Sequence, residues 1–191
     1  MTTQNEFQEK LNRIHTAARK ETPDRVPVLP NIETWVYQYA GVSVREAFLN
    51  DENAAVEAFR KFNEDVYVDG MLGTSNIVPL KMMELFGEGL YTVSEEGLQI
   101  KGSHGVTMQP EDYAALIKDP QSFFANVILP RKYPVLAQSA DANKELLAKA
   151  FDEFAAYAAY NGRVAKRIVE DVKLPMLTKG AAYVAPDVVL D

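Results

Sequence analysis

The sequence contains no cysteine among its 191 residues. This absence excludes a disulfide framework, a thiolate nucleophile and any metal that is bound through sulfur within these residues. Any chemistry that the chain performs must therefore use oxygen or nitrogen groups, or a cofactor.

The sequence also lacks a long apolar run and a basic cluster. No stretch approaches the roughly 18 apolar residues of a membrane helix, and the polar N-terminus does not resemble a signal peptide, so we expect a cytoplasmic protein without a membrane partner. Asp and Glu together number 27 against 20 Lys and Arg, which gives a net charge of -7. This balance argues against nucleic acid as a partner, although it leaves room for a local basic pocket that takes a carboxylated ligand.

What the sequence does contain is the composition of a folded globular protein, 47% apolar and 25% charged. Helical and strand patterns alternate along its first third. The pattern predicts a capped helix that starts at Thr3 with Glu6 and ends near Lys20, a strand over 26–29, a helix capped by Asp51, and a strand over 65–69.

The later pattern predicts a β-hairpin, several helices and a third buried strand. The predicted elements are a hairpin of 90–93 with 98–101, helices that open at Pro110 and Pro120, a long helix from about 139–141, a strand over 173–178 and a helical start at 185–187. Strands separated by helices are typical of an α/β fold with a parallel sheet.

Three short stretches carry a resemblance to a known family. They are Thr22-Pro23-Asp24-Arg25-Val26-Pro27-Val28, then Tyr39-Ala40-Gly41-Val42-Ser43, and later Val66-Tyr67-Val68-Asp69-Gly70-Met71-Leu72. In order and spacing they resemble the opening of the uroporphyrinogen decarboxylase and corrinoid methyltransferase superfamily. The resemblance implies the N-terminal portion of a (β/α)8 TIM-type barrel, with residues 1–191 as a single domain.

A complete barrel of this type needs about 250 residues, and the pattern supplies three of its strands. We therefore expect an incomplete barrel, either as a truncated chain or as a smaller open sheet. Because an open parallel sheet has unpaired edges, we also expect the chain to self-associate.

The resemblance implies roles for two residues. Asp69 matches the aspartate that binds the pyrrole nitrogens of the substrate in the decarboxylases, and Tyr183 is the candidate match for a substrate-contacting tyrosine. We expect both to be catalytic. A strand-end aspartate that caps a turn and a tyrosine that serves packing are the structural alternatives.

The chain departs from the decarboxylases after its first predicted strand. Segment 30–38 has no arginine, whereas a tetrapyrrole with many carboxylates needs bidentate arginine donors. This departure favours the other branch of the superfamily, in which a methyl group moves between a small substrate and a corrinoid. The zinc ligands of that branch would lie beyond Asp191, and we expect no metal ligand in this chain.

Four further residues are candidates for substrate binding. Asn31, Glu33 and Trp35 follow the first predicted strand, where Glu33 is suited to act as a base and Trp35 to stack on a planar ligand. A helix start with Asn31 as its N-cap is the alternative. His104 is suited to donate a proton or bind a metal, although no second histidine or cysteine lies near it in the sequence. Asp24 and Arg25 are expected to fix the turn between helix and strand.

Three hypotheses for function follow. The first is corrinoid-dependent methyl transfer involving a small substrate, with a corrinoid protein as the implied partner. The second is a tetrapyrrole carboxy-lyase that needs no cofactor. The third is a non-catalytic fragment that binds a partner or a cofactor. Arginines that face the pocket would favour the second hypothesis, and zinc ligands downstream would favour the first.

Overall fold

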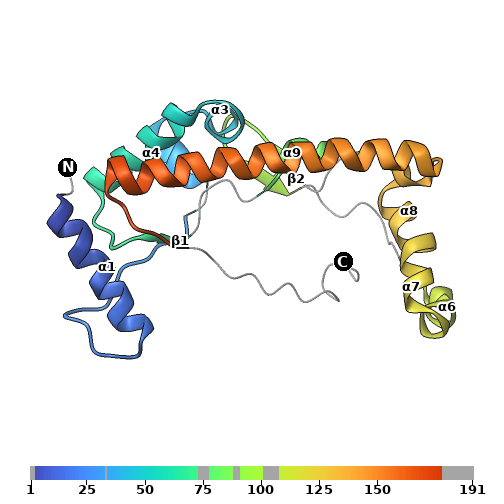
Figure 1. Cartoon of the computed structure of the whole chain (residues 1–191), viewed down its shortest axis with the longest axis horizontal. Helices are drawn as coiled ribbons and strands as arrows, with labels where there is room; N and C mark the ends of the chain where they lie inside the picture. The colour runs from blue at the N-terminus through green and yellow to red at the C-terminus, as the bar shows by residue number, and fades with distance from the viewer. Residues whose placement is uncertain (1–2, 33, 73–77, 88–90, 101–107, 178–191) are drawn as a thin grey trace. The chain divides into compact units, whose positions relative to one another are not determined.

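The computed structural model describes residues 3–32, 34–72, 78–87, 91–100 and 108–177, and it is 67% helical (Figure 1). The α-helices are α1 (Gln4–Ala18), α2 (Trp35–Ala40), α3 (Val44–Leu49), α4 (Glu52–Asp65), α5 (Leu80–Glu84), α6 (Tyr113–Lys118), α7 (Pro120–Phe123), α8 (Leu129–Lys132) and α9 (Ala140–Arg167). The 3-10 helices are η1 (Pro110–Asp112) and η3 (Pro134–Ala137), and the π-helices are η2 (Phe124–Ile128) and η4 (Ile168–Val172).

The described strands form two small sheets. Strand β1 (Met71–Leu72) pairs in parallel with β4 (Met176–Leu177), with Met71 opposite Met176 and Leu72 opposite Leu177. Strands β2 (Tyr91–Val93) and β3 (Leu98–Ile100) form the second sheet, a hairpin whose turn is closed by the bond from Ser94 N to Gly97 O.

The chain divides into two compact units. The first comprises residues 1–78, 93–99 and 156–180, and the second comprises 79–92, 100–155 and 181–191. The prediction of a single domain stays a prediction.

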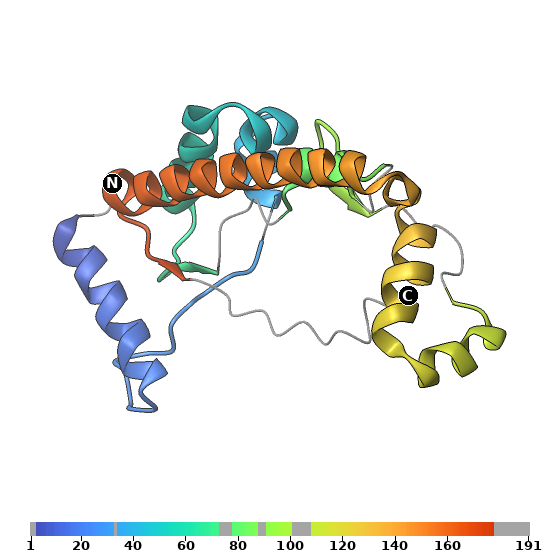
Figure 2. The ribbon, with the colours of Figure 1, turned by 45° about the vertical axis from the view of Figure 1, so that its right-hand side comes forward.

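The core of the first unit is helical. Helices α2, α3 and α4 lie together, and η4 packs against α4 (Figure 2). The buried side chains of this core include Val36, Tyr37, Val44, Phe48, Val56, Phe59, Ile168 and Leu174. The Tyr37 and Phe59 rings meet edge to face at 6.2 Å. Polar side chains of α4 complete the contact, because Arg60 and Asn63 donate to the carbonyls of Asp171 and Val172 at the end of η4.

A proline accounts for the π-helix in the second unit. Pro130 has no N–H, so it cannot bond the carbonyl four residues before it in an α-helix. The N–H of Leu129 bonds Phe124 O, and this wider turn is η2. In the same unit the guanidinium of Arg131 binds Asp112 at 2.5 Å, which ties α8 to η1.

Several local predictions are confirmed. Thr3 caps α1 in a capping box with Glu6, and Asp51 caps α4 by accepting from Ala54 N at 2.9 Å. The hairpin, the helices that open at Pro110 and Pro120, and the long helix α9 also lie where the sequence predicts them. The helical start predicted at 185–187 lies outside the described residues.

The predicted barrel is wrong. The chain is largely helical, and its described strands have only two or three residues each. Such short strands share too few backbone hydrogen bonds to close into a barrel. Contacts between helices form the core instead.

Two of the predicted strands also differ in detail. Segment 26–29 is not a strand. The Val28 carbonyl accepts from Asp69 N, but the Val28 N–H donates to the Asp69 side chain and not to a backbone carbonyl, so the two segments do not form a ladder. The strand predicted over 65–69 lies at 71–72 instead, after Asp69.

No helix in the described part of the chain is long and apolar enough to span a membrane. The expected cytoplasmic location remains a prediction.

Candidate functional site

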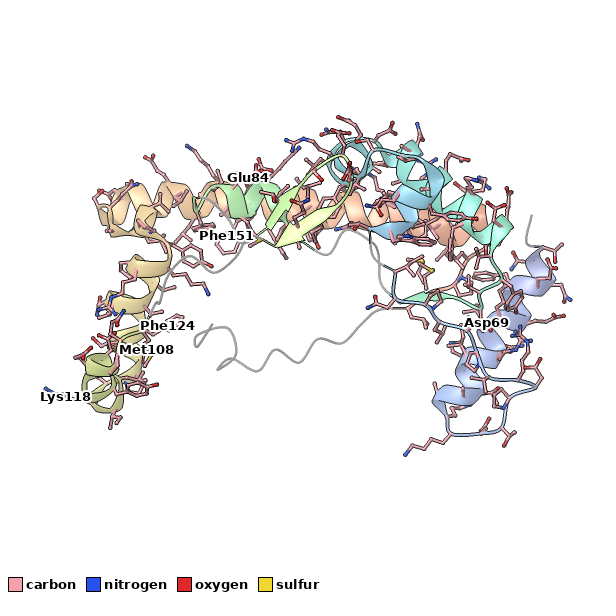
Figure 3. The ribbon with its side chains drawn as sticks, turned by 180° about the vertical axis from the view of Figure 1, so that it is seen from behind. Asp69, Glu84, Met108, Lys118, Phe124 and Phe151 are labelled. Carbon is pink, nitrogen blue, oxygen red and sulfur yellow. The ribbon has the colours of Figure 1, made fainter. Side chains whose placement is uncertain are left out.

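Asp69 is the buried centre of an ion cluster in the first unit, beside α1 (Figure 3). Its side chain has no exposed surface. Oδ1 accepts from Arg13 Nη1 at 2.5 Å, from the Tyr67 hydroxyl at 2.7 Å and from Arg25 Nη2 at 3.2 Å. Oδ2 accepts from the Val28 N–H at 2.8 Å and from Arg25 Nη1 at 3.3 Å. These five donors satisfy the carboxylate, which is the condition under which a charge can be buried.

Arg13 links this cluster to the turn after α1. Its Nε and Nη2 atoms each donate to one oxygen of Asp24 at 2.6 Å, a bidentate pair of the kind that arginine forms best. The hydrogen bonds to Asp24 and Asp69 raise the pKa of Arg13, and the same contact lowers the pKa of Asp24. Asp24 therefore fixes the turn that it was predicted to fix, by binding a helix residue 11 positions earlier.

Tyr67 gives the cluster an aromatic face. The Arg25 guanidinium lies over the Tyr67 ring at 4.5 Å from its centre, and Lys10 Nζ lies at 5.4 Å. Arg25 also donates to the Tyr67 hydroxyl, which in turn donates to Asp69. The ring therefore holds two cations on its face while its hydroxyl extends the hydrogen-bond network.

The position of Asp69 along the strand bears on its role. Asp69 precedes β1, so it lies at the amino end of the parallel β1–β4 pair, whereas ligands of parallel sheets bind at the carboxyl ends. Gly70 follows, and a Cβ at Gly70 would lie 2.8 Å from Pro175 O. The backbone is thus pressed against the neighbouring segment at this point. Both facts favour a role for Asp69 in positioning the chain.

Trp35 and Asn31 lie elsewhere on the first unit. Trp35 is 48% exposed and packs against Tyr39 and Phe62, with ring centres 5.1 and 6.2 Å away. Asn31 is exposed. Thr34 precedes α2 as its N-cap residue, so Asn31 is not the cap that the alternative reading proposed. Glu33, His104 and Tyr183 lie outside the described residues.

The sequence pattern did not single out Lys10, Arg13 or Tyr67, and it gave Asp24 and Arg25 of the same cluster only a role in the turn. The spacing of two pairs of residues does indicate that the members of each pair share a face. Lys10 and Arg13 are three residues apart and therefore share a face of α1, and Tyr67 and Asp69 alternate along an extended segment so that they point the same way. Nothing local indicates that the two pairs meet.

No group of three His, Cys, Asp or Glu side chains in the described ranges is arranged to hold a metal ion. Comparison of the chain with protein-family models, with curated proteins and with solved structures finds no match.

Proposed function

We propose that the chain belongs to an enzyme of the superfamily that its sequence resembles. The reaction that we propose is methyl transfer between a small substrate and a corrinoid. The proposal rests on the three short stretches of resemblance and on the contacts that their residues make. It does not rest on a barrel.

One observation carries the proposal. Residues from two of the three stretches meet around Asp69, because Arg25 binds Asp69 and Val28 exchanges two hydrogen bonds with it, while Asp24 is joined to Asp69 through Arg13. Two stretches more than 40 positions apart in the sequence are thus joined by one set of contacts.

The hydrogen bonds of Arg13 and Arg25 favour methyl transfer over decarboxylation. All three nitrogen positions of Arg13 donate to Asp24, Tyr67 or Asp69, and both terminal nitrogens of Arg25 donate to Asp69 or Tyr67. A porphyrinogen with many carboxylates needs arginine donors that are not already committed to the protein's own carboxylates. A small substrate and a corrinoid make no such demand.

Asp69 is a positioning residue in this proposal, since its oxygens are occupied by the chain itself. Trp35 and Asn31 are the described candidates for ligand contact, because an indole that is half exposed offers a flat surface to a planar macrocycle. The described residues do not fit a zinc site.

The proposal is tested by titrating the full chain with methylcobalamin and, separately, with coproporphyrin, by absorbance and calorimetry. We expect methylcobalamin to bind and coproporphyrin not to. Trp35→Leu should weaken methylcobalamin binding by about tenfold or more, which corresponds to roughly 1.4 kcal/mol. Tyr113→Leu, at an aromatic residue of similar exposure in the second unit, is the matched control and should leave the affinity unchanged.

Other outcomes decide against the proposal. Binding of coproporphyrin alone would establish the tetrapyrrole carboxy-lyase alternative. Binding of methylcobalamin without demethylation when a thiol acceptor is added would support the non-catalytic, cofactor-binding alternative. Binding of neither compound would overturn the resemblance as a guide to function.

A further inference from the structure

A depression of about 430 Å³ lies on the first unit, beside the Asp69 cluster and separate from Trp35. Helix α1 contributes Glu6, Glu9, Lys10 and Arg13 to its lining, the end of α4 contributes Asn63 and Glu64, and Arg25 and Tyr67 complete it. This volume falls within the range of pockets that hold small molecules.

Lys10 is the unusual residue of this depression, since a lysine is rarely buried without a charged partner. It is 7% exposed, and the hydrogen bond found for its ammonium among the described residues is a long one of 3.4 Å to Asn63 Oδ1. A lysine ammonium has three donors. Burial lowers the pKa of Lys10, while Asp69 and Glu6 act in the opposite direction.

The three cations of the lining, Lys10, Arg13 and Arg25, differ in whether they form ion pairs. Arg13 and Arg25 form ion pairs with Asp24 and Asp69, whereas no ion pair of Lys10 is found within the part of the chain that the structure describes. Glu6 and Glu9 of the same helix each accept a hydrogen bond, from Thr3 N and from Asn5, and among the described residues neither forms an ion pair with Lys10. The ammonium therefore has room for an anionic group of a ligand.

The rim of the depression carries negative charge. Glu6, Glu9 and Glu64 are all exposed residues of its lining. A simple anion that approached Lys10 would be repelled by these three carboxylates, and a simple cation would be repelled by Lys10 and the two arginines. A molecule that carries both charges satisfies both regions.

We propose that this depression binds a small zwitterion, with its carboxylate on Lys10 and its ammonium toward Glu64 and Glu9. The site is separate from the corrinoid surface proposed above, and it stands or falls independently of methyl transfer.

The test uses three probes of equal chain length, 4-aminobutyrate, butyrate and butylammonium, which are titrated into the full chain by calorimetry at low salt. We expect 4-aminobutyrate to bind at least about tenfold more tightly than either singly charged probe. Lys10→Met keeps the aliphatic stem of the side chain and should abolish this binding. Lys118→Met, at an exposed lysine of α6 in the second unit, is the control and should not change it.

A second variant gives a readout that loss of folding cannot imitate. Glu64→Gln removes one rim charge from an exposed position, so it should weaken 4-aminobutyrate binding and strengthen butyrate binding. Equal affinity for the three probes, absence of binding by all of them, or binding that Lys10→Met and Glu64→Gln leave unchanged would each overturn the proposal.

Discussion

Asp24 and Asp69 are both held by Arg13, but their surroundings differ greatly. The Asp24 side chain is 62% exposed and that of Asp69 is fully buried. An exposed ion pair is screened by water and salt and contributes little, whereas the loss of one partner from a buried pair leaves a charge without compensation. The same arginine thus takes part in one weak and one strong interaction.

The exposed pair predicts a pH dependence of stability. Arg13 lowers the pKa of Asp24 below its ordinary value of 3.8, so the stabilisation is present above that value and is lost as the pH falls through the lower folded value. Urea unfolding of the wild type and of Asp24→Asn should differ by a small amount at neutral pH, and this difference should vanish in acid. A difference that grows on acidification would contradict the assignment.

Local residues were predictable, and distant partners were not. Thr3 with Glu6 and Asp51 with Ala54 are three positions apart, so the caps of α1 and α4 can be identified from short windows of sequence. Asp69 binds residues that lie 44 and 56 positions away. A window of sequence singles out the aspartate but gives no information on what will surround it.

At the scale of elements, replacing either of two glycines by alanine is expected to change the stability of the chain in opposite directions. A Cβ at Gly70, next to β1, would lie 2.8 Å from Pro175 O and 3.2 Å from Ile14 Cδ1, whereas nothing lies within 4 Å of one at Gly162 in α9. Gly70→Ala should destabilise the chain by about 1–3 kcal/mol through overpacking. Gly162→Ala should stabilise it by about 1 kcal/mol through helix propensity.

Denaturant unfolding of the two alanine variants checks this contrast. Equal changes in both would show that β1 is not pressed against the segment before β4.

The misplaced strand has a physical explanation at this scale. Segment 65–69 contains two valines and a tyrosine, which are typical of strands, but Tyr67 and Asp69 direct their side chains into the ion cluster. The β-ladder begins only where a partner backbone is available. Its first hydrogen bond runs from Met71 N to Pro175 O. Strand formation depends on that partner, which the local pattern does not reveal.

At the scale of the whole molecule, the sequence predicted most elements but not their assembly. Helices α1, α4 and α9 and the hairpin follow from periodicity and turn residues, whereas helices α3 and α5 were not predicted and α2 only as an alternative, and the barrel inferred from resemblance is wrong. Leu147, Phe151 and Phe154 recur at helical spacing in α9, yet they are 44%, 73% and 47% exposed. Periodicity identifies an apolar face without identifying what covers it.

Self-association of the chain likewise stays a prediction, because it depends on contacts that no local pattern specifies. Light scattering of the purified protein would test it.

The central claim is that Asp69 organises the first unit by holding α1, the turn after it and the approach to β1. The most direct test is urea unfolding of the wild type and of Asp69→Asn, followed by the fluorescence of Trp35, the one tryptophan in the sequence and a residue of the same unit. Asp24→Asn is the control, since it removes the exposed partner of the same arginine.

We expect Asp69→Asn to lower the free energy of unfolding by about 3 kcal/mol or more, because it removes the buried negative charge that Arg13 and Arg25 share. Asp24→Asn should lower it by much less, because the Asp24 carboxylate is exposed to water and salt. A loss of less than about 1 kcal/mol in Asp69→Asn would contradict the claim, and Asp69 would again be a candidate for direct contact with substrate.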